Sequence, residues 1–217
     1  MANKKNIKTT KECFDIILKG NKKDSHVARL SLRKIVYSNY KTSEYKVIVR
    51  IVKDALRIYE KIDEEWRQEN FIVALSTIYF LRDYKKYPPD HLFPLFLGLL
   101  QHSNGNIRYA TVRMLRDEII FLSIYLRLPE EEKKGDRQRK LEFDHILYWL
   151  YVGLIRLSDV IETWEEVDYE KYKYIDEIPS SSYKSVQMVI ANMIEFCGEE
   201  NIEAMNREMT LRGDDVN

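Results

Sequence analysis

The fold of this chain is decided by the stretch Leu99-Leu100-Gln101-His102-Ser103-Asn104-Gly105-Asn106-Ile107-Arg108-Tyr109-Ala110-Thr111-Val112-Arg113-Met114-Leu115. It indicates the end of one helix, a tight turn and the start of a second helix. The apolar residues of the second helix follow helical spacing, at Ile107, Ala110, Met114 and Leu115. Helix pairs of this kind bury their faces by stacking on further pairs. The stretch therefore predicts an all-α protein, an α-solenoid of stacked antiparallel helical hairpins.

The composition favours long helices. The chain has 217 residues, 45% of them hydrophobic and 32% charged, with only 7 Gly and 5 Pro. The longest strongly apolar runs, over 70–81 and 145–155, are shorter than the roughly 20 residues that cross a bilayer. No apolar signal region follows the first five residues. We expect a soluble, cytoplasmic protein with no membrane partner.

The overall charge of zero conceals an asymmetry. Residues 1–57 contain fifteen Lys or Arg against five Asp or Glu, a net charge of +10, so the remainder carries −10. This polarity is compatible with an anionic partner at one end or with electrostatic self-complementarity. Composition leaves both alternatives open, and it leaves the oligomeric state open as well.

Helical periodicity divides the chain into about nine helices. We expect them near 10–19, 25–39, 43–62, 64–84, 89–101, 105–127, 139–164, 182–197 and 199–211. Gly20 is predicted to close the first helix in a left-handed conformation. Residues 1–128 would form the repeats, 129–140 a charged loop, 141–212 further helices of the same domain, and 213–217 a disordered tail.

The second helices of successive pairs can be overlaid on one another. Val27, Leu30, Leu32 and Ile35 match Ile107, Ala110, Val112 and Leu115 at an offset of 80 residues, and Phe71 to Ala74 match Ile107 to Ala110 at an offset of 36. The pattern of an aliphatic residue, an arginine and then small and large apolar residues resembles the HEAT family of helical repeats over residues 10–127. Only Ile107-Arg108 carries the aliphatic–arginine pair, and the aspartate that the family tends to place five residues earlier is His102 here. The resemblance implies an armadillo-type solenoid whose concave face binds partners.

In such a stack, the side of each second helix opposite its buried arc would line a concave groove. Arginine and aromatic side chains are typical of binding hot spots. Arg108 lies inside the apolar arc of its helix, so we expect it to join neighbouring repeats by hydrogen bonds. The predicted partner-binding residues are Arg29, Arg33, Phe80, Tyr84, Tyr109, Arg113 and Arg116.

A second basic feature lies on the helix expected over 43–62. Five cations follow one side of it and would meet phosphates, an acidic partner or only solvent: Lys46, Arg50, Lys53, Arg57 and Lys61.

No arrangement typical of catalysis, of a metal or of a cofactor is found. Cys13 and Cys197 are far apart in the sequence, and neither has His or Cys neighbours at zinc-site spacing. The seven glycines are scattered singly, so no glycine-rich phosphate loop is present. We therefore expect no enzyme activity and no cofactor.

Three functions follow from these observations. The first is a non-enzymatic scaffold or adaptor that binds a protein partner through the concave Arg/Tyr-lined face. The alternative is a HEAT-like protein that binds nucleic acid through the basic N-terminal third. A more remote third option is an enzyme similar to the alkylpurine DNA glycosylases, which share this architecture but are expected to be more basic.

Overall fold

The computed structural model describes residues 9–39, 42–82, 89–124, 137–160 and 178–211. All regular secondary structure in these ranges is helical, with ten α-helices where the sequence predicted about nine. This confirms the all-α class. The chain divides into two compact units, residues 1–88 and 89–217. Within the described ranges, no helix has both the length and the apolar character needed to span a membrane.

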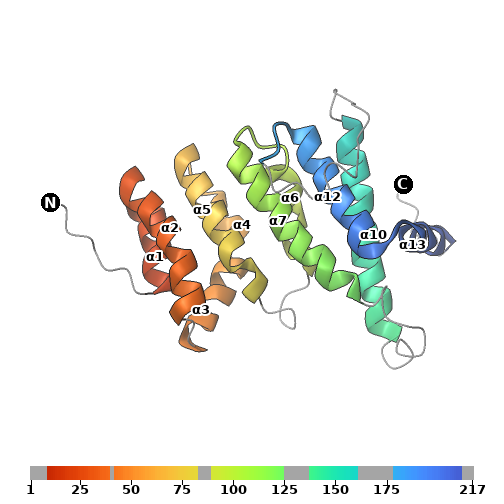
Figure 1. Cartoon of the computed structure of the whole chain (residues 1–217), viewed down its shortest axis with the longest axis horizontal. Helices are drawn as coiled ribbons and strands as arrows, with labels where there is room; N and C mark the ends of the chain where they lie inside the picture. Colours follow the sequence, from red (N-terminus) through yellow and green to blue (C-terminus); the bar gives the residue numbers. More distant parts are fainter. Residues whose placement is uncertain (1–8, 40–41, 83–88, 125–136, 161–177, 212–217) are drawn as a thin grey trace. The chain divides into compact units, whose positions relative to one another are not determined.

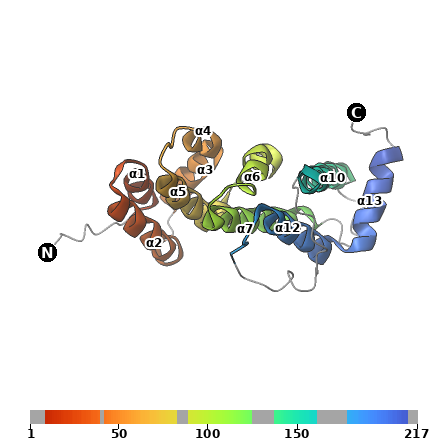
Figure 2. The same cartoon turned by 90° about the horizontal axis from the view of Figure 1, so that it is seen from above.

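The first unit is built on one helical hairpin and a third helix that packs against both of its arms. The hairpin is α1 (Thr10–Lys19) with α2 (Lys22–Asn39), and α5 (Glu65–Ile78) packs against both, followed by a short 3-10 turn η1 (Tyr79–Leu81). Helices α3 (Thr42–Lys53) and α4 (Ala55–Tyr59) also pack against α5, and α3 contacts α1 (Figures 1 and 2). Phe14 and Phe71 meet edge to face in this core, with ring centroids 6.0 Å apart.

The first helix has the predicted bounds, but the conformation of its C-terminal cap differs. Thr9 and Glu12 form a capping box, in which each side chain accepts a backbone N–H of the other residue. The predicted left-handed cap at Gly20 is wrong, because Gly20 is extended with φ −76° and ψ 171°. The guanidinium of Arg67 on α5 donates to the carbonyl oxygens of Ile17 and Gly20 at 3.0 Å. The Arg67 side chain thus donates to carbonyl oxygens at the end of α1, as backbone N–H groups do in a left-handed cap.

Buried polar side chains tie α2 to α5 at the same place. The Asn70 amide donates to Ser25 Oγ at 3.0 Å, and the Ser25 hydroxyl donates to the Ile17 carbonyl oxygen at 3.2 Å. The start of α2 differs from the sequence prediction, because Asn21 accepts the N–H of Asp24 and the helix begins three residues earlier than expected, at Lys22.

The continuous helix predicted over 43–62 is interrupted at Asp54. Aspartate is a poor residue for a helix interior, and its carboxylate here contacts Arg57 of the following turn at 3.2 Å. The segment therefore forms α3, a turn and the short helix α4.

The described part of the second unit contains five α-helices. They are α6 (Phe93–Leu99), preceded by the 3-10 turn η2 (Pro89–Leu92), then α7 (Gly105–Leu122), α10 (Arg137–Val160), α12 (Ser182–Cys197) and α13 (Glu199–Leu211). Helix α12 lies beside α7, α10 packs against both, and α13 runs across the ends of α10 and α12 (Figures 1 and 2). Asn104 and Ser181 cap α7 and α12 through their side chains.

Two predicted segments of this unit fall largely outside the described residues. The charged loop predicted over 129–140 is described only from residue 137, where α10 has already begun, so its last four residues are helical. The tail predicted over 213–217 lies outside the described residues.

Arg108 joins three parts of the second unit. It is 6% exposed and donates to the carbonyl oxygens of His102 and Ser103, at 2.6 and 2.8 Å, and to that of Pro179, at 2.6 Å. Burial lowers the pKa of the guanidinium, which nevertheless keeps its charge. Arg108 thus holds the α6–α7 turn against the segment that leads into α12. Its hydrogen bonds were predicted from its place in the apolar arc, whereas a link between neighbouring repeats stays a prediction.

The burial of α5 and α7 follows the same pattern at the predicted offset of 36 residues. In α5 and the turn after it, seven positions are buried: 71, 72, 74, 75, 76, 78 and 79. The positions 36 residues later are buried as well, and Phe80 and Arg116 are both exposed.

The offset of 80 for α2 is wrong at Val27 and Leu30, which are exposed although Ile107 and Ala110 are buried. An offset of 79 aligns the buried residues instead, Ala28, Leu32, Ile35 and Val36 with Ile107, Thr111, Met114 and Leu115.

Replacing Arg108 with Met should lower the free energy of unfolding by about 2–4 kcal/mol, because three carbonyl oxygens lose a charged donor. Arg113→Met on the same helix is the control, since Arg113 is exposed and should change stability by no more than about 0.5 kcal/mol. Urea denaturation measures both, and equal effects would contradict the role of Arg108.

Gly198→Ala should destabilise the protein by about 1–2 kcal/mol, because Gly198 has φ +83° at the end of α12. Gly98→Ala serves as the opposite control. Gly98 lies in α6 with no atom within 4 Å of an added Cβ, so the alanine should raise stability by about 0.5–1 kcal/mol. Thermal melts of the two variants should therefore shift in opposite directions.

Candidate interaction surface on helix α2

Helix α2 buries one side and exposes large apolar residues on the other. Ala28, Leu32, Ile35 and Val36 are buried. Along the opposite side, Val27 is 46% exposed, Leu30 62% and Tyr37 67%. These three residues span about 15 Å of helix at a rise of 1.5 Å per residue. Isolated exposed apolar residues are ordinary, but a row of three on one helix is typical of a surface that contacts a partner.

The row continues onto the end of α5 through an aromatic contact. Tyr37 stacks on Phe80 of η1, with ring centroids 5.9 Å apart and planes inclined by 21°. Phe80 is itself 42% exposed. The stack holds two aromatic rings in place at the surface, which reduces the side-chain entropy that a partner must remove on binding.

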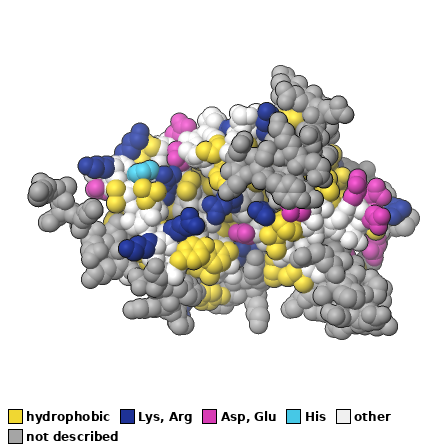
Figure 3. Space-filling view, in the orientation of Figure 1, with side chains coloured by type: hydrophobic (Ala, Val, Ile, Leu, Met, Phe, Trp, Pro, Cys, Tyr) yellow, Lys and Arg dark blue, Asp and Glu magenta, His cyan; other side chains and the backbone are white. Residues whose placement is uncertain are grey.

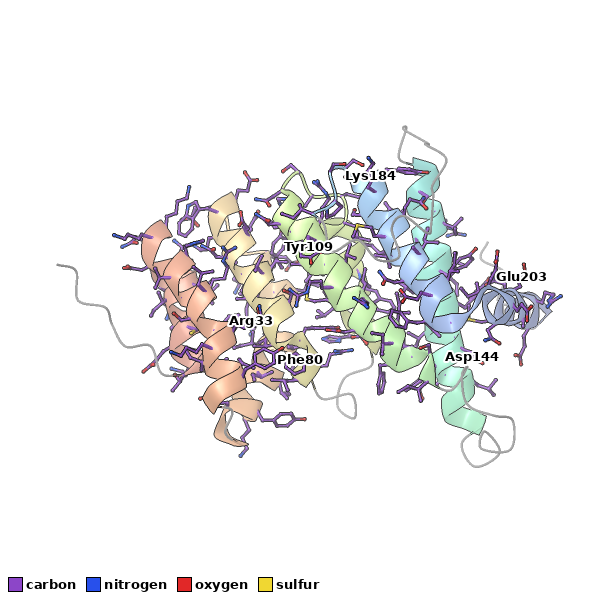
Figure 4. All side chains as sticks on the ribbon, in the orientation of Figure 1. Arg33, Phe80, Tyr109, Asp144, Lys184 and Glu203 are labelled. Carbon is purple, nitrogen blue, oxygen red and sulfur yellow. The ribbon has the colours of Figure 1, made fainter. Side chains whose placement is uncertain are left out.

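Cationic side chains surround the apolar row. Lys23, Arg33 and Lys34 lie on α2 and are exposed. Arg33 and Phe80 are labelled in Figure 4, on α2 and at the end of α5. Hydrophobic and basic side chains lie next to each other on this part of the first unit (Figure 3). We call the set Val27, Leu30, Arg33, Lys34, Tyr37 and Phe80 the α2 face.

Two of the predicted binding residues belong to this surface, and a third has another role. Arg33 and Phe80 are part of the α2 face. The side chain of Arg29 is only 14% exposed and forms an ion pair with Glu69 of α5, at 3.1 Å. Arg29 therefore links α2 to α5 within the first unit, and we leave it out of the candidate surface.

The remaining predicted residues lie elsewhere. Tyr84 lies outside the described residues. On α7 of the second unit, Arg113 and Arg116 are exposed and Tyr109 is half-buried. Arg116 lies over the ring of Phe196 on α12, 5.4 Å from its centroid. A groove that joins the residues of both units remains a prediction.

The basic row predicted near the third helix is exposed but divided by the turn at Asp54. Lys46, Arg50 and Lys53 lie on α3, Arg57 lies on α4, and Lys61 lies in the turn that follows; all five are exposed. Arg57 and Arg50 approach the Asp54 carboxylate at 3.2 and 3.9 Å. Part of the positive charge of this row is therefore compensated locally.

Sequence reasoning missed Val27 and Leu30, because the overlay treated them as core. The signal that could have found them is the competing arc of Ala28, Leu32, Ile35 and Val36, which is equally periodic. A single amphipathic helix with apolar residues on both sides leaves open which side is buried.

The titratable groups of the described residues form no metal site, since no group of three His, Cys, Asp or Glu side chains is placed to hold an ion.

Both cysteines are buried. Burial, with smaller contributions from the neighbouring carboxylates of Glu12 and Glu44, raises the pKa of the Cys13 thiol from 9.0 to about 12. Such a thiol stays protonated near neutral pH, so it is a poor nucleophile.

Comparison with known proteins gives no relative from which a function could be transferred. No family model matches the chain, and neither a curated protein nor a solved structure matches it.

The raised pKa of Cys13 predicts a pH dependence of stability. Above pH 9 the unfolded thiol loses its proton while the folded thiol keeps it, so the unfolded state is favoured increasingly as the pH rises from 9 towards 12. Cys13→Ala should therefore lose less stability than the parent protein between pH 8 and pH 10.5 in urea titrations. Identical slopes for the two proteins would contradict the prediction.

Proposed function

We propose that this protein is a non-enzymatic helical scaffold or adaptor that binds a protein partner, and that the α2 face is its binding surface. The observation that carries the proposal is the exposure of Val27, Leu30 and Tyr37 in one row on a helix whose other side is fully buried. Tyrosine and arginine are enriched among the residues that dominate binding energy, and phenylalanine is enriched at protein interfaces; all three residue types occur on this face.

The chemistry of the face defines the partner. Apolar anchors are needed to cover Leu30 and the Tyr37–Phe80 stack. Carboxylates are needed opposite Lys23, Arg33 and Lys34, because the one acidic residue of α2, the exposed Asp24, lies in its first turn and accepts a hydrogen bond from Asn21. We therefore propose an acidic amphipathic helix, with apolar residues at helical spacing flanked by Asp or Glu, as the bound segment.

The architecture supports the same role. The equivalent burial of α5 and α7 is what stacked helical pairs would produce, and we propose that the chain is a HEAT-like repeat protein of the armadillo type.

A defined peptide tests the proposal directly. A fluorescein-labelled helical peptide with Leu at positions i, i+3 and i+7 and Glu on both flanks should bind the full chain saturably in anisotropy measurements. A peptide with Lys in place of each Glu should bind at least tenfold more weakly because of like-charge repulsion.

Leu30→Asp should weaken peptide binding about tenfold or more, as expected for loss of an apolar anchor. The matched control is Leu56→Asp on α4. Leu56 is also exposed, at 37%, but lies outside the α2 face. Equal binding by the two variants, or no saturable binding by the parent chain, would contradict the proposal.

Nucleic-acid binding is a second candidate, favoured by the five exposed cations from Lys46 to Lys61. It predicts binding of a labelled single-stranded oligonucleotide that weakens steeply with salt. Lys46→Glu with Lys53→Glu would then abolish binding of the oligonucleotide, whereas Leu30→Asp would leave it unchanged.

A further inference from the structure

The first unit contains a hollow of about 500 Å³, away from the exposed apolar row of α2. Three segments bound it: the end of α1, the helix α4 with the turn that follows, and the start of α5. Its lining residues are Leu18, Lys19, Arg57, Ile58, Lys61, Ile62, Glu64 and Arg67. Small-molecule sites in proteins have volumes of roughly 300–1,000 Å³, so the hollow is large enough for a small organic molecule.

The apolar part of the lining is aliphatic. Leu18 and Ile58 are half-buried, and Ile62 is buried at 6% exposure. The lining contains no aromatic ring and no carboxamide. Such a surface suits an aliphatic chain and offers no aromatic ring on which a nucleobase could stack.

The charged part of the lining is positive. Arg67 donates to both oxygens of Glu64, at 3.0 and 3.3 Å. These hydrogen bonds lower the pKa of the Glu64 carboxyl and keep it ionised and compensated. Arg57 forms an ion pair with the carboxylate of Asp54, which compensates its charge. The charge excess therefore rests on Lys19 and Lys61, which are both exposed at the rim.

Arg67 also fixes the shape of the hollow. The same guanidinium that compensates Glu64 donates to the carbonyl oxygens of Ile17 and Gly20. It therefore holds the end of α1 against the start of α5, and two of the three walls stay together. A preformed site of this kind loses little conformational entropy when a ligand binds.

We infer that this hollow binds a small aliphatic carboxylate, with its chain against Leu18, Ile58 and Ile62 and its carboxylate between Lys19 and Lys61. Two properties of the same hollow point to this ligand class, its aliphatic floor and its cationic rim. The inference is independent of the α2 face, because no residue of that face lines the hollow.

Calorimetric titration of the full chain with sodium decanoate, below its micellar concentration, tests the inference. Decanoate should bind saturably with one molecule per chain. Acetate, which lacks the chain, and decyltrimethylammonium, which carries the opposite charge, should each bind at least tenfold more weakly. Equal binding of the cationic amphiphile would overturn the inference, and so would the absence of saturable decanoate binding.

Charge-reversal variants locate the site. Lys19→Glu and Lys61→Glu should each weaken decanoate binding about threefold to tenfold, since a partly exposed charge contact is replaced by a repulsive one. Lys46→Glu makes the same charge change at an exposed lysine outside the hollow and should leave affinity unchanged. An equal loss with Lys46→Glu would show a nonspecific charge effect and overturn the assignment.

The Leu30→Asp variant should bind decanoate with the affinity of the parent chain. Weaker binding by this variant would place the ligand on the α2 face instead.

Discussion

The backbone carbonyl groups at the ends of helices must find donors, and in this protein two arginines supply them. Arg67 and Arg108 each lie in the first turn of a helix. Arg67 donates to the last carbonyls of α1, and Arg108 donates to the turn after α6 and to Pro179. An unpaired buried carbonyl costs free energy comparable to a lost hydrogen bond. These contacts therefore determine how each helix ends and which segments must lie together within each unit.

The candidate functions arise where this packing leaves surfaces uncovered. Helix α5 contacts α1, α2, α3 and α4, so all of its residues except Glu65 are buried or half-buried. Helix α2 packs on only one side, which leaves Leu30 and Tyr37 exposed. The turn at Asp54 separates α3 from α4, and α4 then forms one wall of the aliphatic hollow together with the ends of α1 and α5. Two distinct surfaces, which we propose bind a helical partner and a small carboxylate, lie on the same helical unit.

Much of the local structure could be predicted because its causes are local. The helices over 10–19, 182–197 and 199–211 have the predicted bounds, and Asn104 and Ser181 cap their helices through side chains close in sequence. Two of the errors occur where a distant residue intervenes. Gly20 is extended because Arg67, 47 residues away, satisfies its carbonyl. The side chain of Arg29 is largely buried because Glu69, 40 residues away, forms its ion pair.

The sequence by itself determined the all-α class, most helix positions, the buried role of Arg108 and the exposure of Arg33, Arg113 and Arg116. Periodicity fixes these features because it places each side chain at a known angle around its own helix. The tertiary structure decided that Ala28 and Leu32, and not Val27 and Leu30, enter the core, and that Lys19, Ile58 and Lys61 surround one hollow. The buried side of α2 and the lining of the hollow depend on which helix covers which side of its neighbour. The angle of a residue around its own helix does not show where the neighbouring helix packs.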